Sequence, residues 1–266
     1  MQSLDRNTSS SFVVGSEMNV PRVRYSSNVR HFATVRGMTD QGTLSVVATP
    51  IGNLGDITLR ALETLKRSDA IACEDTRVTS KLLSRYDISK PLLVYHARSG
   101  RLAGERVLAL LGEGKRVALV TDAGTPGISD PGQALVALVR ARLDDTVRIE
   151  TIPGPSAVAA ALSIAGLPCA EYVFLGFLPH KKGRQTLINE IAEESRTVVF
   201  YESPHRIDKA LAALAAALPE TRQVAVCREL TKIHEETVIG TPREVAAHYA
   251  THRDTARGEF VVIVAP

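Results

Sequence analysis

The stretch that most constrains the fold runs from Val117 to Gly132 and reads VALVTDAGTPGISDPG. Its first four residues, Val117–Val120, are apolar and predict a short strand buried on both faces. Threonine, aspartate, glycine and proline then crowd together, so the chain must turn sharply. Residues 133–142 are apolar at helical spacing, and we expect Pro131 just inside the start of that helix. A strand, a glycine-rich turn and a helix form the unit with which open α/β sheets build ligand crevices.

Strands and helices alternate around this unit. Four further strands are predicted, at Leu44–Ala48, Ala70–Cys73, Leu92–Tyr95 and Val147–Ile152. The helices expected between and after them are Ile57–Lys66, a helix through Lys81 and Arg85, Arg106–Leu111, and the alanine-rich Ala157–Ala165, which should close this half. This alternation predicts an α/β fold whose first sheet is mostly parallel, with helices on both faces.

Three loops rich in glycine and proline follow predicted strands, at Thr49–Asp56, Asp122–Pro131 and Pro153–Ser156. Loops at the carboxyl ends of parallel strands gather along one edge of a sheet, where they can meet around one ligand. Any one of them could be a tight turn that binds nothing, but three together favour a small-molecule site. Asp122 would supply a carboxylate at its mouth. None matches the dinucleotide fingerprint or the phosphate-binding loop.

A second unit is expected to begin near Tyr172, after Leu167–Cys169. Its predicted strands are Tyr172–Phe177, Thr197–Glu202, Gln223–Cys227, Thr237–Ile239 and Phe260–Ala265. Its predicted helices are Gln185–Glu194, Ile207–Leu218 and Arg243–Tyr249, the last capped by Thr241 with Pro242 and Glu244. We therefore predict two α/β domains, residues 42–167 and 168–266, the second with a mixed sheet.

Composition excludes several classes of protein. The three cysteines are far apart and lack CxxC spacing, which favours a reducing, cytoplasmic setting over zinc binding or a disulfide framework. Eighteen consecutive apolar residues occur nowhere, so no membrane span is predicted. The chain has no tryptophan and only 5% aromatic residues, which argues against an aromatic platform for single-stranded RNA.

The positive charge is concentrated at the amino terminus. Residues 1–41 contain five of the 32 basic and three of the 29 acidic residues, so the remainder carries 27 against 26. Nucleic-acid binding by this nearly neutral remainder must therefore come from local patches. The leader itself lacks periodicity and is expected to be disordered. Its Arg-rich, Ser-rich composition allows two interpretations. The leader is an organellar transit peptide, or the protein begins at Met38 and the residues before it do not belong to it.

Seven motifs occur in order between Ser45 and Lys232: SVVATPIGNLGDITLRALETL, ACEDTR, LVTDAGTPGISDPG, PGPSA, GFLP, FYESPHR and CRELTK. This series resembles the ribosomal RNA small subunit methyltransferase I family, within the tetrapyrrole-methylase-like class of S-adenosylmethionine enzymes. The resemblance covers nearly all of residues 42–266. It implies two α/β domains with the cofactor S-adenosyl-L-methionine in the cleft between them, a homodimer, and no metal. It also implies methyl transfer to the 2′-hydroxyl of a cytidine in the decoding region of small-subunit rRNA, free or in the assembled subunit.

The resemblance assigns cofactor contacts to the three loops and to one strand end facing them. These residues are Pro50, Gly52, Asn53, Asp122, Gly124, Thr125, Pro126, Gly154, Pro155 and Tyr201.

A 2′-hydroxyl is a weak nucleophile, so a base near it would help the transfer. The candidates are Glu74, Glu202 and Lys182 and, beside these, Asp75, Glu229 and Lys181. The sequence does not choose among them, because pairs such as Glu74–Arg77 and Arg228–Glu229 could simply fix loops.

The best local basic patch is HKKGR, His180–Arg184, directly after the GFLP motif. We expect Lys181, Lys182 and Arg184 to contact RNA phosphates. Arg206, after His205, is equally consistent with an RNA contact and with a role at the start of a helix.

Two features depart from the family pattern: the loop His96–Arg101 after Tyr95, and the end of the chain at Pro266, where many members continue. Two other readings stay open. One is a small-molecule methylase of the same fold, which the HKKGR patch disfavours. The other is a non-catalytic RNA-binding protein, which would not need three glycine turns on one edge.

Overall fold

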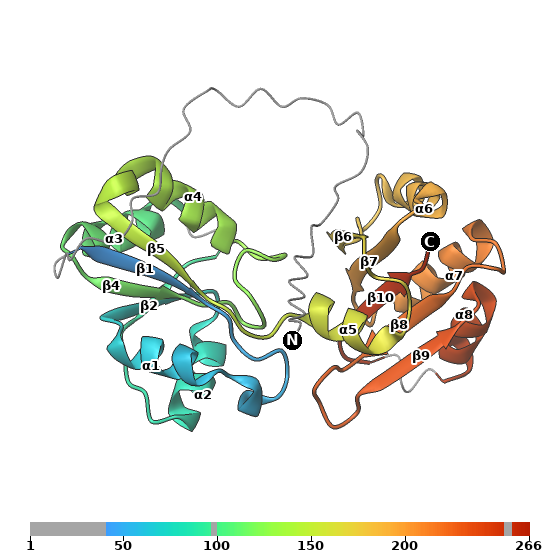
Figure 1. Cartoon of the computed structure of the whole chain (residues 1–266), viewed down its shortest axis with the longest axis horizontal. Coiled ribbons are helices and arrows are strands. Elements are labelled where there is room, and N and C mark those ends of the chain that lie inside the picture. Colours follow the sequence, from blue (N-terminus) through green and yellow to red (C-terminus); the bar gives the residue numbers. More distant parts are fainter. Residues whose placement is uncertain (1–40, 97–99, 253–256) are drawn as a thin grey trace, which may run out of the picture. The chain divides into compact units, whose positions relative to one another are not determined.

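The computed structural model describes residues 41–96, 100–252 and 257–266, which are built around two five-stranded sheets (Figure 1). The predicted disordered leader, residues 1–41, lies outside the described residues except for Gln41. Residues 97–99 of the loop that departs from the family pattern also lie outside them.

The first sheet is entirely parallel, as predicted, with the strand order β3-β2-β4-β1-β5. Its strands are β1 (Gly42–Val47), β2 (Ala70–Cys73), β3 (Leu92–Val94), β4 (Arg116–Leu119) and β5 (Val147–Ile152). The strand from the constraining stretch, β4, is the central one, and Val117, Ala118 and Leu119 are buried. A central strand with helices on both faces has no wet side, which explains its unbroken apolar run.

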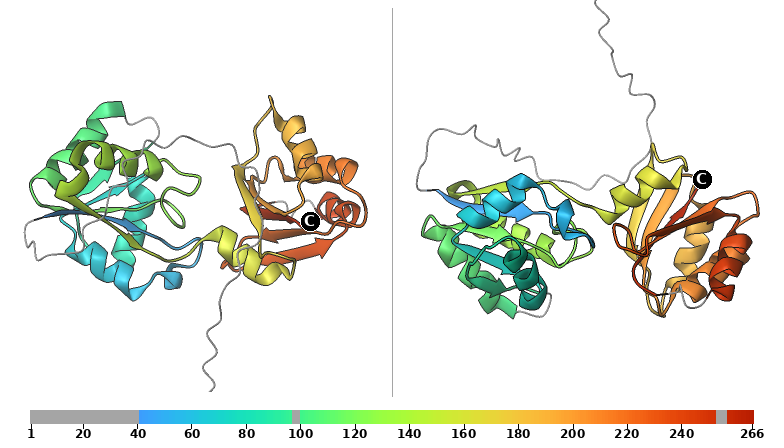
Figure 2. Two further views of the ribbon diagram at one scale, coloured as in Figure 1. Left: turned by 45° about the horizontal axis from the view of Figure 1, so that its top comes forward. Right: turned by 90° about the horizontal axis from the view of Figure 1, so that it is seen from below.

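Helices cover both faces of the first sheet (Figures 1 and 2). On one face α1 (Leu59–Arg67) and α2 (Thr76–Arg85) pack against side chains such as Ile71. On the other face α3 (Gly100–Gly112) and α4 (Gly132–Leu143) pack against Leu44 and its neighbours. Successive strand residues point to opposite faces, so each strand contributes to both cores.

The second sheet is mixed, as predicted, with the order β6-β7-β10-β8-β9. Its strands are β6 (Tyr172–Phe177), β7 (Thr197–Glu202), β8 (Val224–Arg228), β9 (Glu236–Gly240) and β10 (Phe260–Val264). β6 and β7 are parallel, whereas the other neighbours are antiparallel. One face packs against α6 (Arg184–Glu193), α7 (Ile207–Ala217) and α8 (Pro242–Thr251). The predicted capping box of Thr241 and Glu244 opens α8.

The alanine-rich helix α5 (Ala157–Ala165) corrects one expectation. It packs on the other face of the second sheet, against β8 and β10, instead of closing the first half. Its buried stripe is small, with Val158, Ala161 and Ala165, which lets the helix lie close to that sheet. Helical periodicity identifies a buried face but not the partner of that face. The chain therefore changes sheets before α5, whereas the expected domain boundary follows this helix.

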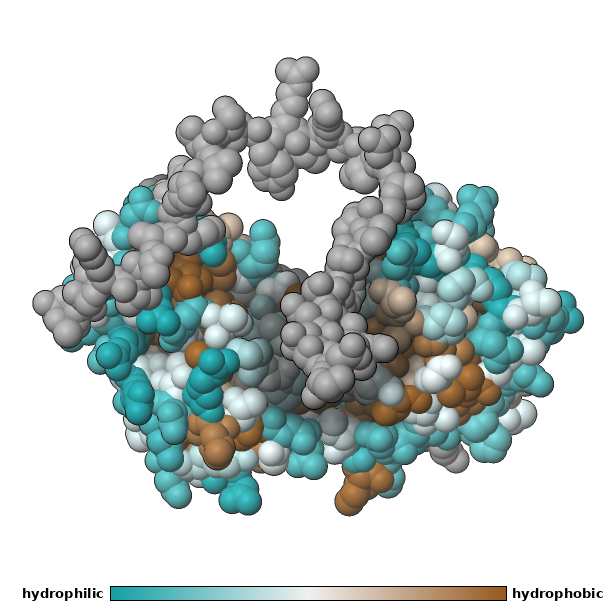
Figure 3. Space-filling view, viewed as in Figure 1, coloured by the Kyte–Doolittle hydropathy of each residue, from teal (hydrophilic) through white to brown (hydrophobic). Residues whose placement is uncertain are grey.

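In the described part of the chain, no helix has the length and apolar composition needed to cross a lipid bilayer. On the face shown in Figure 3, hydrophobic side chains form separate groups among polar ones. The three cysteines are free, Cys73 and Cys227 buried and Cys169 exposed.

Candidate active site

The three loops rich in glycine and proline meet at one edge of the first sheet, as the sequence predicted. Thr49 and Gly124 exchange backbone hydrogen bonds of 2.9 and 3.1 Å, which join the loop after β1 to the loop after β4. The Thr125 hydroxyl donates to the carbonyl of Pro155 at 3.1 Å, which adds the loop after β5. These contacts build a continuous wall from three separate segments.

The loop after β4 is held by its own residues. Gly124 and Gly127 have φ angles of +85° and +89°, a conformation that glycine adopts without steric cost. The carboxylate of Asp130 accepts from the backbone N–H groups of Gly127 and Gly132. Helix α4 starts at Gly132, so Pro131 lies just before the helix and not inside it. The helix begins one residue later than predicted, and the Asp130 carboxylate accepts a hydrogen bond from its first backbone N–H, that of Gly132.

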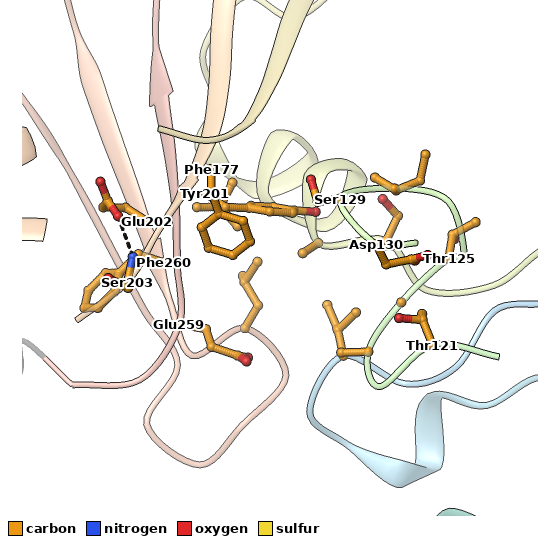
Figure 4. A pocket seen from close by; sticks show the side chains of 18 of the residues that line it. Thr121, Thr125, Ser129, Asp130, Phe177, Tyr201, Glu202, Ser203, Glu259 and Phe260 are labelled. Carbon is orange, nitrogen blue, oxygen red and sulfur yellow. Dashed lines mark hydrogen bonds between the residues drawn. The ribbon is translucent and has the colours of Figure 1, made fainter. Parts of the chain in front are cut away.

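A pocket of about 400 Å³ opens beside this wall (Figure 4). The first-sheet side contributes Thr121, Gly124, Thr125, Ser129 and Asp130, among others. The opposite side comes from the second sheet and its loops, and includes Phe177, Tyr201, Leu230, Glu259 and Val261. The lining thus combines hydroxyls and carboxylates with apolar side chains, the pattern of a site for a small polar molecule that carries an apolar part.

Of the residues expected to contact a cofactor, Gly124, Thr125 and Tyr201 line this pocket. Pro155 supports it by holding Thr125 through its carbonyl. The side chain of Pro126, next in the chain to Thr125, is buried.

The residues of the first and third loops that were expected to contact the cofactor, apart from Pro155, do not line the pocket but pack against other parts of the protein. Pro50 is buried, whereas Gly52 and Asn53 are exposed and face the loop after β8. The backbone N–H of Asn53 donates to the Thr231 hydroxyl at 3.1 Å. Gly154 packs so closely on Ala48 that an added Cβ would lie 3.0 Å from its methyl carbon.

Asp122 joins the ends of two neighbouring strands. Its carboxylate accepts from the backbone N–H of Asp75 at 3.1 Å. Together with Glu74, Val94 and His96 it lines a second hollow next to the pocket. Burial raises the pKa of Asp122, and the nearby carboxylates raise it further.

Glu74 is the one candidate acid that lines both hollows. Burial raises its pKa, and the negative charges of Asp122 and Asp130 add to this effect. The expected alternative, an ion pair with Arg77, is not what the structure has: Arg77 pairs with Asp75 at 2.6 Å. That pair, with hydrogen bonds from Arg77, lowers the pKa of Asp75 to about 2, and Asp75 caps α2.

Glu229 is held in a loop network at the end of β8. Its carboxylate accepts from Lys232 Nζ at 2.7 Å and from the backbone N–H of Glu259 at 3.0 Å. The Lys232 hydrogen bond and charge hold the pKa of Glu229 below its usual value. The alternative expected from sequence was an ion pair between Arg228 and Glu229, but Arg228 pairs with Glu236 at 3.0 Å.

Glu202 is buried at the end of β7 with two arginines around it. Arg206 lies 2.7 Å and Arg184 3.1 Å from its carboxylate oxygens. The same carboxylate accepts from the backbone N–H of Ser203 at 2.8 Å. Its lone pairs are thus largely occupied, which suits a structural anchor better than a proton acceptor.

The two arginines expected to contact RNA therefore point toward Glu202. Arg184 also donates to the carbonyl of Pro179, and Arg206 to that of Leu178 at 2.9 Å. Lys181 and Lys182, in contrast, are exposed on the loop. Of the four residues expected to contact RNA, the two arginines are therefore anchored on Glu202 and the two lysines are surface cations.

Several pocket residues were not expected from sequence, among them Thr121, Ser129, Phe177, Leu230, Glu259 and Val261. Glu259 and Val261 reach the pocket because β10 inserts between β7 and β8. This non-local pairing leaves no local pattern in the chain. Phe177 had a usable signal, since it ends an apolar strand immediately before the basic loop.

Comparison with known proteins agrees with this geometry. Residues 43–246 match the family model described as Tetrapyrrole (Corrin/Porphyrin) Methylases. Among curated proteins, the chain is 49% identical over 224 residues to Ribosomal RNA small subunit methyltransferase I of Mesorhizobium japonicum, covering 84% of this chain and 75% of that one. The protein of the same name from Thermotoga maritima is 41% identical over 223 residues, covering 84% and 98%.

Solved structures show the same fold at low sequence identity. A cobalt precorrin-4 methyltransferase superposes with a TM-score of 0.62 at 18% identity, over 84% of this chain and 94% of that one. The methyltransferase CobJ gives a TM-score of 0.63 at 20% identity, over 85% and 94%. With relatives at 41–49% identity across most of the chain, the protein belongs to the ribosomal RNA small subunit methyltransferase I family of tetrapyrrole methylases.

Proposed function

We propose that this protein transfers a methyl group from S-adenosyl-L-methionine to the 2′-hydroxyl of a cytidine in the decoding region of small-subunit rRNA. One observation carries the proposal: the match to relatives named for small-subunit rRNA methylation spans 84% of this chain, and most of the pocket lining, apart from residues 258–261, lies within the family match. Fold likeness alone would not separate this activity from tetrapyrrole methylation.

The residues around the pocket fit the proposed cofactor. Its volume of about 400 Å³ lies in the range of small-molecule sites. A cationic sulfonium and an amino group suit a lining that contains Glu74 and Asp130, and an adenine suits the apolar Leu230 and Val261. The positive φ at position 124 favours glycine, and Gly124 leaves this part of the wall without a side chain. S-adenosylmethionine supplies an activated methyl group, so the protein must mainly orient the hydroxyl oxygen in line with it.

Glu74 is assigned as the proton acceptor for the 2′-hydroxyl. It lines the pocket and its raised pKa makes it a stronger base than an ordinary carboxylate. By contrast, hydrogen bonds occupy the carboxylates of Asp75, Glu202 and Glu229. Glu202 is instead a positioning residue, which holds the loop that carries Lys181 and Lys182. These two lysines are assigned to RNA phosphates.

The substrate is small-subunit rRNA, free or in the assembled subunit, met in the cytoplasm by a homodimer. The resemblance supports the dimer, and light scattering on the purified protein tests it. The expected boundary at 167/168 moves to before α5, because this helix packs on the second sheet, and the two α/β units are proposed to enclose the cofactor.

The function is tested with purified protein, labelled S-adenosylmethionine and small ribosomal subunits that lack 2′-O-methylation. We expect the label on the ribose of one cytidine of the decoding region, mapped by nuclease digestion and mass spectrometry. Label on another nucleotide would contradict the assigned target. Cofactor binding without transfer to any rRNA, but with transfer to a tetrapyrrole, would favour the small-molecule alternative. Absence of cofactor binding would favour the non-catalytic RNA-binding alternative.

A further inference from the structure

Phe177 is an exposed aromatic residue at the rim of the pocket. It is the last residue of β6, and 55% of its surface is exposed although it is one of the most hydrophobic side chains of the protein. Its ring meets that of Tyr201 edge to face, with centroids 5.4 Å apart and an angle of 61°. In Figure 4 the two rings lie together at the pocket, with Ser129 of the loop after β4 beside them. An exposed aromatic face at a site is free to stack on a ligand.

An irregularity in β6 places Phe177 there. Phe174 pairs with Val199 and Phe177 with Tyr201, so three steps along β6 match two along β7. Regular alternation would put Phe177 on the face of Leu175, which packs into the core beneath α6–α8. The extra residue in β6 moves the side chain of Phe177 to the opposite face of the sheet, on which Tyr201 also lies. Bulges of this kind redirect side chains beside functional sites.

The residues around the bulge hold Phe177 in this position. Gly176 has a φ of +64°, which favours glycine, and a Cβ there would lie 3.1 Å from the Ser129 hydroxyl oxygen. Behind Phe177, the ring of Tyr201 also meets Phe174 at 5.0 Å. Burial raises the pKa of the Tyr201 hydroxyl, which lies near Val158 at the start of α5. Phe177 therefore rests on an aromatic neighbour that is itself packed against Phe174.

We propose that Phe177, backed by Tyr201, is the stacking surface for the base of the target nucleotide. The assignment rests on the proposed function, since it takes the ligand to be an unpaired nucleotide of rRNA. A 2′-hydroxyl can approach the methyl group only if its nucleotide leaves the surrounding RNA, and unstacked bases are held on aromatic side chains. The composition argued against an extended aromatic platform, whereas one base needs only one exposed ring.

Position favours the target base over the adenine of the cofactor. Phe177 is exposed at the rim, whereas Thr121, Leu230 and Val261 are buried side chains of the same lining. Only three residues separate Phe177 from Lys181, the first exposed lysine of the basic loop. RNA phosphates on that loop would bring a base to the rim. Ser129, on the facing loop, offers a hydroxyl to the edge of the base.

The test compares Phe177→Ala, Phe177→Leu and Phe177→Trp with the wild type. The matched control is Tyr172→Ala, because Tyr172 is an exposed aromatic of the same strand that does not line the pocket. Two quantities are measured: kcat/KM for methylation of small subunits, and the Kd of S-adenosylmethionine by calorimetry. Phe177→Ala and Phe177→Leu should lower kcat/KM roughly 10- to 100-fold, the range for losing one stacked base. Phe177→Trp and Tyr172→Ala should stay close to wild type, and the cofactor Kd should change less than about twofold in all.

The outcomes separate this inference from the function on which it rests. If Phe177→Ala weakens cofactor binding as much as it lowers kcat/KM, the ring stacks on the cofactor and the assignment to the target base is wrong. If Phe177→Ala methylates as well as wild type, the ring has no stacking role and the inference fails while the proposed function stands. If the wild type binds cofactor but methylates no rRNA, both fail together. Loss with leucine and rescue with tryptophan supports aromatic stacking over simple burial.

Discussion

Among the acidic residues near the pocket, the surroundings and not the residue type decide what each one does. Asp75 is neutralised by Arg77, Glu202 by two arginines, and Glu229 by Lys232. Glu74 and Asp122 instead lie among other carboxylates, and their pKa values are raised. Groups with raised pKa values in a pocket are candidates for proton transfer.

Glu74→Gln should lower kcat about 100-fold or more, because it removes the proposed proton acceptor but keeps the shape of the side chain. In the wild type, activity should fall at low pH as Glu74 becomes protonated, at a pH above the ordinary value for glutamate because its pKa is raised. The variant should lose this acidic limb. The measurement is the pH profile of single-turnover methylation.

Stability provides a control for the Glu74 variant. A raised pKa means that the ionised carboxylate costs the folded state free energy above that pKa, so Gln should leave the Tm unchanged or raise it. Glu63→Gln, on the exposed surface of α1, is the matched substitution and should leave activity and Tm unchanged. A Glu74→Gln enzyme with wild-type kcat would rule out the assigned role.

Glu202→Gln should destabilise the protein by about 3–5 kcal/mol, because it leaves Arg184 and Arg206 without their buried partner. The free energy of unfolding in urea measures this loss. The control is Glu220→Gln, which breaks an exposed pair with Arg243 and should cost less than about 1 kcal/mol. Equal losses for the two variants would mean that the Glu202 pair contributes no more than a surface pair.

At the scale of elements, local patterns predicted most helices and strands but not all their partners. The strands Ala70–Cys73, Val147–Ile152 and Thr197–Glu202 have the predicted bounds, because short apolar or alternating stretches between turn residues define them. The packing of α5 on the second sheet and the insertion of β10 beside β7 were not predictable, since both depend on distant segments. The pocket shows the same division. The glycines and prolines of the three loops predicted the wall formed by the first sheet, whereas Tyr201 was the main predicted residue of the wall formed by the second sheet.

Arg222 is an element-scale feature that no pattern revealed. It is buried and its guanidinium donates to the carbonyls of Ala265, Ile191, Ala192 and Glu194. It thereby ties the end of α6 to the residue that follows β10. Burial lowers its pKa, so the hydrogen bonds must offset the cost of the buried charge.

Arg222→Lys should therefore lower the free energy of unfolding by about 2–3 kcal/mol, because an ammonium cannot reach several carbonyls in the planar arrangement of a guanidinium. Denaturation in urea measures the change. Arg196→Lys, near the same end of α6 but largely exposed and paired with Glu194, should change stability by less than about 1 kcal/mol. A loss no larger than that of Arg196→Lys would show that charge alone suffices at position 222.

Across the whole molecule, positive and negative charges nearly balance, so we expect RNA binding to depend on a few residues. Outside the leader the chain carries 27 basic and 26 acidic residues, so no general positive field draws it to RNA. Glu202 holds Arg184 and Arg206, which leaves Lys181 and Lys182 as the exposed cations of that loop. Electrostatic attraction to rRNA should thus be local and should respond strongly to these two lysines.

Replacing both lysines, Lys181→Ala with Lys182→Ala, should weaken binding to small subunits and reduce the slope of log K against log salt concentration by about 1–2, since each phosphate contact contributes roughly one. The cofactor Kd should not change. Binding is measured by filter retention of labelled subunits across a salt series. The matched control, Lys66→Ala with Arg67→Ala, removes two exposed charges at the end of α1 and should leave the slope unchanged. Equal changes in the two double variants would mean that net charge, and not the loop after β6, determines the attraction to RNA.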